Sequence, residues 1–348
     1  MNKGILVPDA GPRKGGRESG SNHDSRITIH AVIAALALGL ICTAAGAQQY
    51  PSRPVRFIVP QAAGGGVDIM ARAVAQKLTE TWGQQVIVDN RPGANGIIGI
   101  EPVVKAKPDG YTLSAAFTSV LTINPHVYKS LPYDPVRDFS PITQTVTNTM
   151  VLVVHPSLPV RTVKDLVALA RSRPGELNYG SFGVGNLTHL AGELLSAEAR
   201  IKMVHVPYKG ETPALTDLIG GQVVLLSAVS SAAAPHIKAG RMRLIATGGA
   251  RRARAWPDTP SMAEAGYPNA TVTGWNGFLA PAGTPREIVE KIQRDSAKHL
   301  LSTELRDRLA ALGADPVGST PDQFAAFIRS ETEKFARAAR TAGIYHSQ

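Results

Sequence analysis

The stretch VRFIVPQAAGGGVD, residues 55–68, joins a β-branched run to three glycines and then to the start of an apolar-periodic segment. The pattern predicts a buried strand, a tight turn and a helix. Gly64, Gly65 and Gly66 let the backbone turn with several N–H groups facing one point, and the helix adds the partial positive charge of its N-terminus. This junction therefore predicts a cradle for an anion.

A second junction of the same kind lies at GSFGVGNLTH, residues 180–189. It offers hydroxyl, amide and bare backbone donors ahead of a helix, at Ser181, Gly183, Gly185, Asn186 and Thr188. Because a phosphate loop needs only one such junction, two widely spaced ones predict a ligand held between two lobes. Its negative ends would then lie against backbone amides, one end in each cradle.

Short β-branched runs alternate with helical patterns along the chain, which is typical of an α/β fold. The predicted strands are 55–59, 86–88, 111–117, 151–155, 203–206, 223–226, 243–247 and 272–280. Two segments have the composition of a capped helix start, with Thr at the cap and Pro at the first helical position. They begin at Thr284 and Thr320.

No flexible linker interrupts the pattern, so we expect two lobes joined by chain segments that cross between them. The predicted crossings lie within residues 140–149 and 272–279. Lobe 1 would then hold residues 48–147 together with 277–348, and lobe 2 residues 148–276. Each lobe would be a sheet flanked by helices.

Residues 1–47 have the charged, apolar and small-residue parts of a secretory signal. Basic residues precede an apolar run from Ala31 to Cys42, and Ala45-Gly46-Ala47 follows. A membrane anchor is the alternative, but the run is shorter than the roughly 20 apolar residues of a spanning helix. We therefore expect export, with cleavage after Ala47.

Composition excludes several classes of site. Cys42 is the only cysteine, so the exported chain can hold neither a disulfide framework nor a thiolate metal site. The net charge is +10, yet the basic residues are dispersed and aromatic residues make up 5%, which argues against nucleic-acid binding. His189 precedes Glu193 by four residues, but one His and one Glu make an incomplete zinc site, and a helical pair or a buried hydrogen bond is favoured. We predict no metal and no cofactor.

Several collinear motifs resemble the tripartite tricarboxylate transporter substrate-binding proteins, the Bug or TctC-like group. They are AGGGVDIMAR (63–72), VDNRPGANG (88–96), KPDGYTL (107–113), LNYGSFGVGNLTHLAGEL (177–194), HVPYKGETPALTDLIGGQV (205–223) and TGWNGFLAPAGTP (273–285). The likeness runs from about Tyr50 to Gly343. It implies a periplasmic, two-lobed Venus-flytrap protein of the type II kind, monomeric, which binds a small carboxylate by hinge closure and delivers it to a membrane permease.

The resemblance also implies that Thr118, Ser119 and Tyr208 line the pocket, because each follows a predicted strand and open α/β sheets bind ligands beyond such strand ends. Lys209 is taken as a surface charge and left out of the site. His189 is included among the candidate ligand-binding residues. For Asp68, two interpretations stay open, a ligand contact and a helix N-cap.

The chain departs from the family pattern at two places. Gln61 stands where the family often has an aromatic residue, and Ser227-Ala228 where it often has an acidic one. A missing carboxylate removes an obvious partner for a ligand ammonium group. We therefore expect a carboxylate without an amino group.

An enzyme finds no support in the motifs. Residues 180–183 do not form the G-x-S-x-G nucleophile elbow, residues 183–185 lack the third glycine of a dinucleotide fingerprint, and no Gly-Lys-Ser/Thr loop occurs. A secreted hydrolase is therefore the weakest alternative. A ligand sensor for a membrane kinase would use the same pocket, so the sequence leaves that alternative open.

Overall fold

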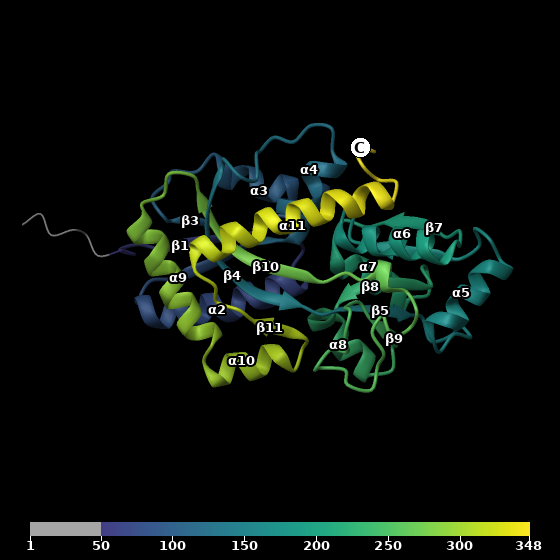
Figure 1. The fold of residues 1–348 in the computed structure, drawn as a ribbon. Helices are drawn as coiled ribbons and strands as arrows, with labels where there is room; N and C mark the ends of the chain where they lie inside the picture. The colour runs from purple at the N-terminus through teal and green to yellow at the C-terminus, as the bar shows by residue number, and fades with distance from the viewer. Residues whose placement is uncertain (1–49) are drawn as a thin grey trace, which may run out of the picture. The chain divides into compact units, whose positions relative to one another are not determined.

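Two mixed β-sheets with helices on their faces make up residues 50–348, the part of the chain that this computed structural model describes (Figure 1). The predicted secretory signal, residues 1–47, lies outside the described residues. Both sheets have parallel strands at their centres or edges and antiparallel strands beside them, and helices follow most strands. The α/β class with two helix-flanked sheets is confirmed.

The six-stranded sheet has the order β11-β4-β10-β3-β1-β2. Its strands are β1 (Val55–Val59), β2 (Val86–Asn90), β3 (Thr112–Phe117), β4 (Phe139–Asn148), β10 (Gly274–Pro281) and β11 (Ala314–Pro316). The first three run parallel, and Phe57 of β1 lies in register with Val88 of β2 and Leu113 of β3. β10 and β4 run antiparallel to their neighbours. The loops that follow β1 and β3 therefore lie at the same edge of this sheet, beyond the carboxyl ends of its parallel strands.

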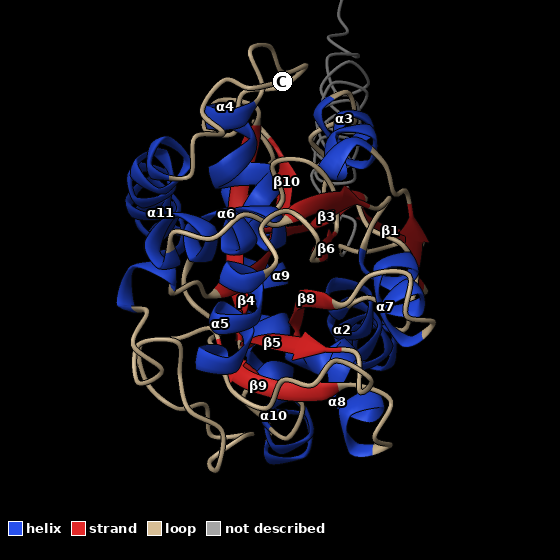
Figure 2. Cartoon of the chain, turned by 90° about the vertical axis from the view of Figure 1, so that its right-hand side faces the viewer, coloured by secondary structure: helices blue, strands red, loops and turns tan. Residues whose placement is uncertain are grey.

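The five-stranded sheet has the order β7-β6-β8-β5-β9. Its strands are β5 (Met150–Val154), β6 (Asn178–Ser181), β7 (Val204–Pro207), β8 (Leu225–Val229) and β9 (Arg243–Thr247). β6 is parallel to both β7 and β8, whereas β5 is antiparallel to β8 and β9. Figure 2 shows this sheet with α5 and α6 on one side and α7 and α8 on the other.

The helices bury their apolar faces on these sheets. Their bounds are α2 (Gly66–Trp82), α3 (Ile97–Val104), α4 (Asn124–Val127), α5 (Val163–Ser172), α6 (Leu187–Ala199), α7 (Glu211–Ile219), α8 (Ser230–Lys238), α9 (Arg286–Leu300), α10 (Thr303–Ala310) and α11 (Pro321–Thr341). In α2, Met70, Val74 and Leu78 recur every fourth residue and are all buried, as expected for a helix with one face on a sheet. Short helical turns occupy η1 (Ala94–Gly96), η2 (Ser119–Ile123) and η3 (Pro268–Ala270).

Only Thr149 separates β4 of one sheet from β5 of the other. The chain returns to the first sheet at β10, which begins at Gly274. Each sheet and the helices that cover it are called a layer below. The C-terminal helix α11 contacts both layers: Phe324 packs edge-on against Trp275 of β10, while Phe335 belongs to the apolar core around α5 and α6. In Figure 1, α11 runs along the molecule from the side of α9 to the side of α6. The lobe boundaries predicted above remain a proposal.

The eight predicted strands are all present, with ends shifted by a few residues. Three strands lie outside the predicted ranges: β4, which contains Pro141 and several polar residues, and β6 and β11, which have only four and three residues. The junction at residues 180–189 implied β6 without giving its bounds. Thr320 caps α11 in a complete capping box, as predicted. The predicted cap at Thr284 is wrong, because α9 starts one residue later and Thr284 donates to the Pro281 carbonyl instead.

Candidate functional site: a pocket between the two sheets

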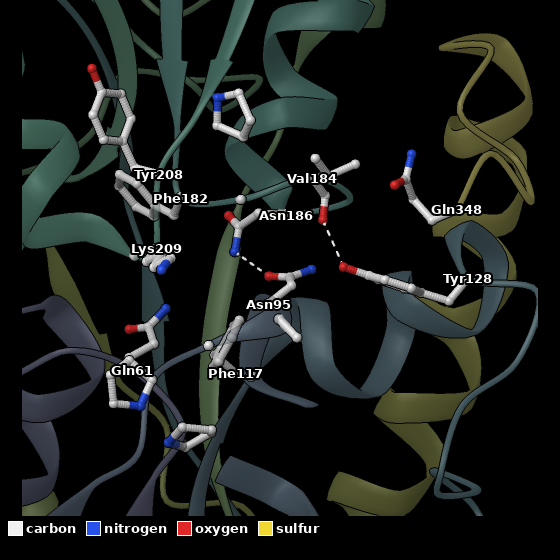
Figure 3. A pocket seen from close by; sticks show the side chains of 18 residues that line it. Gln61, Asn95, Phe117, Tyr128, Phe182, Val184, Asn186, Tyr208, Lys209 and Gln348 are labelled. Carbon is white, nitrogen blue, oxygen red and sulfur yellow. Dashed lines mark hydrogen bonds between the residues drawn. The ribbon is translucent and has the colours of Figure 1, made fainter. Parts of the chain in front are cut away.

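A pocket of about 290 Å³ lies where loops from both sheets meet (Figure 3). Gln61 follows β1, and Phe117 ends β3 of the first sheet. Residues 182–184 and 186 follow β6, Pro207 ends β7, and residues 208–210 come after it in the second sheet's half. Ligands of open α/β sheets bind beyond the carboxyl ends of the strands, and the pocket has this position.

Aromatic rings and side-chain amides together line the pocket walls. Phe117, Tyr128, Phe182 and Tyr208 supply apolar surface, and Gln61, Asn95, Asn186 and Gln348 supply amide groups. In Figure 3, Phe182 and Phe117 lie on opposite walls, one from each sheet. Burial, with Asp217 nearby, raises the pKa of Tyr208 to about 12, so its hydroxyl stays neutral at ordinary pH. The arrangement suits a small organic molecule with an apolar body and a few polar groups.

Hydrogen bonds cross the pocket from one sheet's loops to the other's. Asn186 Nδ2 donates to Asn95 Oδ1 over 2.7 Å, and Tyr128 Oη donates to the Val184 carbonyl over 3.2 Å (Figure 3). Asn95 has φ of 50°, and Ala94 before it has φ of 44°, both in the left-handed region. Such a backbone is costly for alanine and persists where the surrounding contacts fix it.

One cation faces this pocket. Among the described residues that line it, Lys209 alone has a charged side chain, and no Asp or Glu side chain joins it. Lys209 is exposed and forms no ion pair within the described part of the chain. The site therefore has a positive charge available and offers no carboxylate side chain to a cationic ligand.

A smaller cavity of about 30 Å³ lies next to the pocket and shares Gln61, Phe117, Phe182 and Asn186 with it. Thr118, Ser119 and Thr188 also line this inner cavity. Three buried polar atoms there have no partner among the described residues: Gln61 Oε1, Asn148 Oδ1 and Asn276 Nδ2. A cavity of this size can hold a water molecule, and these three atoms supply hydrogen-bond partners for it.

Two amides of the first glycine junction, those of Gly64 and Gly66, bond to carboxylates of the protein itself. Gly64 N–H donates to Asp68 Oδ2 over 2.9 Å, and Gly66 N–H donates to Glu211 Oε2 over 2.8 Å. Burial raises the pKa of the Asp68 carboxyl, but hydrogen bonds from Arg72, Gly64 and Asn90 together outweigh it and hold the pKa below the ordinary value. The Asp68 carboxylate therefore bonds to its own loop, its helix and β2.

The second junction is also hydrogen-bonded internally. Gly185 N–H donates to His189 Nδ1 over 3.1 Å, and Leu187 N–H donates to Ser119 Oγ of the other sheet's layer over 3.0 Å. Gly185 has φ of 74°, and a Cβ there would lie 2.8 Å from Val127 Cγ1, so only glycine fits this approach of the two layers. Thr188 N–H donates to Asn186 Oδ1, which caps α6.

Two stacked histidines lie under this junction. The rings of His189 and His205 are 3.9 Å apart, and His205 Nε2 lies 2.6 Å from Ser181 Oγ. Burial, and then the neighbouring His205, lowers the pKa of His189 to about 3, and burial lowers that of His205 to about 4. Both rings are therefore neutral at physiological pH and act as packing and hydrogen-bonding groups.

The predicted site residues fall into three groups. Gly183, Asn186 and Tyr208 line the larger pocket, and Thr118, Ser119, Asn186 and Thr188 line the inner cavity. The remaining predicted residues line neither space: Gly64, Gly65, Gly66, Asp68, Ser181, Gly185 and His189. Their binding roles stay predictions.

Several lining residues were not singled out from the sequence. They are Asn95, Phe117, Tyr128 and Phe182, together with Lys209, which was set aside as a surface charge. The strand-end position that indicated Tyr208 applies equally to Lys209, and Phe117 is the last residue of β3. Asn95 lies in the motif NRPGANG, whose two glycines indicate a left-handed turn.

None of the helices in residues 50–348 is both long and apolar enough to span a membrane. Within the same residues, no three His, Cys, Asp or Glu side chains are grouped as a metal site requires.

The sequence matches the family model described as the tripartite tricarboxylate transporter family receptor over residues 70–344. A relative from Pseudomonas sp. (strain P51), the UPF0065 protein in the tcbD-tcbE intergenic region, is 37% identical over 310 residues, which are 88% of this chain and 92% of the relative. Protein BugT of Bordetella pertussis is 36% identical over 304 residues, 87% of this chain and 93% of BugT.

Solved structures give the same result. An R. palustris protein solved with adipate has a TM-score of 0.84 and 36% identity, and covers 85% of this chain and 99% of its own. MatC from Rhodopseudomonas palustris, solved with bound malate, has a TM-score of 0.79 and 28% identity, with 83% and 99% coverage. The periplasmic binding protein BugD has a TM-score of 0.81 and 32% identity, with 85% and 99% coverage. The sequence and the fold of the present chain thus place it in the tripartite tricarboxylate transporter receptor family, in the Bug or TctC-like group of periplasmic solute-binding proteins.

Proposed function

We propose that this protein captures a small carboxylate without an amino group in the periplasm and delivers it, as a monomer, to a tripartite tricarboxylate-type permease. The observation that carries the proposal is the charge of the pocket: Lys209 lines it, and no Asp or Glu side chain does. A carboxylate can pair with Lys209 there, whereas an ammonium group would lose water and meet no Asp or Glu side chain. Adipate and malate in the related structures are carboxylates without amino groups.

The pocket favours binding coupled to closure of the two layers. Loops from both sheets line it, and Asn95–Asn186 and Tyr128–Val184 hydrogen bonds join them across it. A ligand that contacts both layers stabilises the conformation in which they approach, because only there are both sets of contacts made. We expect the ligand's apolar body between Phe117 and Phe182, with polar groups toward Lys209 and the side-chain amides.

The proposal assigns no catalytic step. Ser181 and His205 lie within hydrogen-bond reach of one another, but Ser181 is fully buried, its hydroxyl also bonds to Gly183, and it lines neither cavity. A nucleophile needs access to its substrate and a base that can accept a proton. Burial of this serine leaves the pair a structural role.

A thermal-shift screen with matched ligands tests the proposal. Succinate and aspartate differ by one ammonium group, as do other dicarboxylates and their amino derivatives. At 100 times its dissociation constant, a ligand stabilises the folded protein by about 2.7 kcal/mol. We expect such shifts from carboxylates that have no amino group, and none from their amino derivatives. Equal stabilisation by the amino derivative, or no shift with any mono-, di- or tricarboxylate, would contradict the proposal.

A further inference from the structure

A carboxyl group from the second sheet's layer reaches into the glycine junction of the first. Glu211, the first residue of α7, is 1% exposed. Its Oε2 accepts from the N–H of Gly66, which begins α2, over 2.8 Å. Its Oε1 accepts from the N–H of Val229, which ends β8, over 3.1 Å. One side chain thus joins three elements that come from both layers.

The junction has no spare room around this carboxyl group. A Cβ on Gly65 would lie 3.1 Å from Glu211 Oε2, and a Cβ on Gly66 would lie 2.9 Å from both Ser231 Oγ and Val229 Cγ1. The backbone of the loop therefore packs directly against the side chains of Val229, at the end of β8, and Ser231, at the start of α8. In this conformation Glu211 occupies the place at the Gly66 amide that a solute anion would take.

No cation neutralises Glu211 within the described chain. The charged and titratable groups on the elements packed around it are Asp68, Arg72, Lys77 and Glu80 of α2, Asp217 of α7, His236 and Lys238 of α8, and Tyr208 and Lys209 before α7. Asp68 bonds to Gly64, Arg72 and Asn90. β8 and loop 61–65 contain no charged residue. The hydrogen bonds that Glu211 receives come from backbone amides.

The carboxyl group lies directly behind the pocket wall. Gly210 precedes Glu211 and lines the pocket, and Gln61 precedes the glycine-rich loop and lines it too. A second bond supports the same contact, since Thr212 Oγ1 donates to the Ala63 carbonyl over 2.8 Å. Movement of the loop away from α7 would therefore also move Gln61 out of the wall.

We propose that Glu211 is a positioning residue that clasps the glycine-rich loop, residues 62–66, onto β8, and that protonation of its carboxyl group strengthens the clasp. Through this contact the loop is held in place as one wall of the pocket. Glu211 itself does not contact the ligand, which binds to the residues that line the pocket. Opening the loop exposes Glu211 to water, so the open and clasped states bind a proton with different affinities.

The direction of the pH effect follows from burial. Burial raises the pKa of Glu211 from 4.5 to about 7, although hydrogen bonds from the Gly66 and Val229 amides oppose the rise. A group with a higher pKa in the clasped state binds its proton more tightly there. The clasp is therefore strengthened as the pH falls from about 7 toward 4.5, by up to about tenfold per pH unit, and is insensitive to pH above 7.

Amide hydrogen exchange of the ligand-free protein, measured by NMR, tests this inference. We expect the protection factor of the Gly66 amide to fall up to tenfold per unit between pH 5 and 7 and to level off above. Glu211→Gln keeps one acceptor oxygen and cannot titrate, so its Gly66 protection should be independent of pH and lower than that of the wild type at pH 5. A flat wild-type profile, or the wild-type slope in the Gln variant, would overturn the inference.

Two matched variants separate titration from packing. Thr212→Val removes the neighbouring bond to Ala63 and should lower Gly66 protection at every pH while keeping the wild-type slope. Asp68→Asn should also keep the slope, because the pKa of Asp68 lies below its ordinary value. Loss of the slope in either variant would assign the effect to a group other than Glu211. Because no ligand is present, failure here leaves the proposed carboxylate binding untouched.

Discussion

Asn186 donates from Nδ2 to Asn95 Oδ1 across the pocket, while its own Oδ1 caps helix α6. One side chain therefore joins the two sheets' layers and starts the helix behind the pocket. Asn186→Asp separates these roles, because a carboxylate still caps the helix but cannot donate to Asn95 and adds a negative charge to the pocket.

For Asn186→Asp we expect a carboxylate ligand to bind at least about tenfold more weakly by titration calorimetry, through like-charge repulsion. Asn186→Ala removes the cap and should cost about 1 kcal/mol of unfolding free energy, with a smaller loss of affinity. Wild-type affinity in the Asp variant would show that the ligand does not approach this side chain.

Lys209→Met tests the counter-charge. Because Lys209 is exposed, its ion pair with a ligand carboxylate is partly screened, and we expect about a fivefold loss of affinity together with a weaker dependence on salt. Lys238→Met, at the exposed end of α8 and outside the pocket, is the matched control. Equal effects of the two substitutions would reduce Lys209 to a general contribution to the protein's field.

The buried histidine pair predicts an acid-sensitive fold. The pKa of His189 is about 3 and that of His205 about 4 in the folded chain, below the ordinary value of 6.5. The unfolded chain therefore binds these protons first, and stability present above pH 6.5 is lost as the pH falls toward 4, by up to about 1.4 kcal/mol per pH unit for each ring. When the unfolding free energy is measured with denaturant at several pH values, it should fall less steeply with decreasing pH for His189→Gln than for the wild type. An unchanged slope would mean that the ring is already accessible to protons.

The contact between β10 and α11 predicts one strongly destabilising substitution. A Cβ on Gly277 would lie 2.1 Å from the Phe324 ring and 2.9 Å from the Thr143 carbonyl. Gly277→Ala should therefore lower the unfolding free energy by about 1–3 kcal/mol, as overpacking does. Gly220→Ala, whose Cβ would meet its nearest atom at 3.4 Å, is the control and should stay within about 0.5 kcal/mol of the wild type. Similar midpoints for the two variants in urea would contradict this packing argument.

Local sequence patterns determined the elements and their class. The β-branched runs gave eight strands, and Thr320 with Gln323 marked the start of α11, because strand propensity and capping depend on neighbours along the chain. Polar β4 carried no such signal, since its place between β10 and β11 comes from pairing with segments more than 100 residues away. The rule that ligands bind beyond strand ends indicated Tyr208, which lines the larger pocket, and Thr118 and Ser119, which line the inner cavity.

The partners of the glycine-loop amides were decided by the tertiary structure alone. Glycines predict N–H groups that can converge on an anion, but they do not tell which anion arrives. Gly66 receives the carboxyl group of Glu211, 145 residues further along the chain, and Asn95 receives the amide of Asn186, 91 residues away. Such contacts exist only after two separately formed layers approach each other, and no periodicity along the chain records that approach.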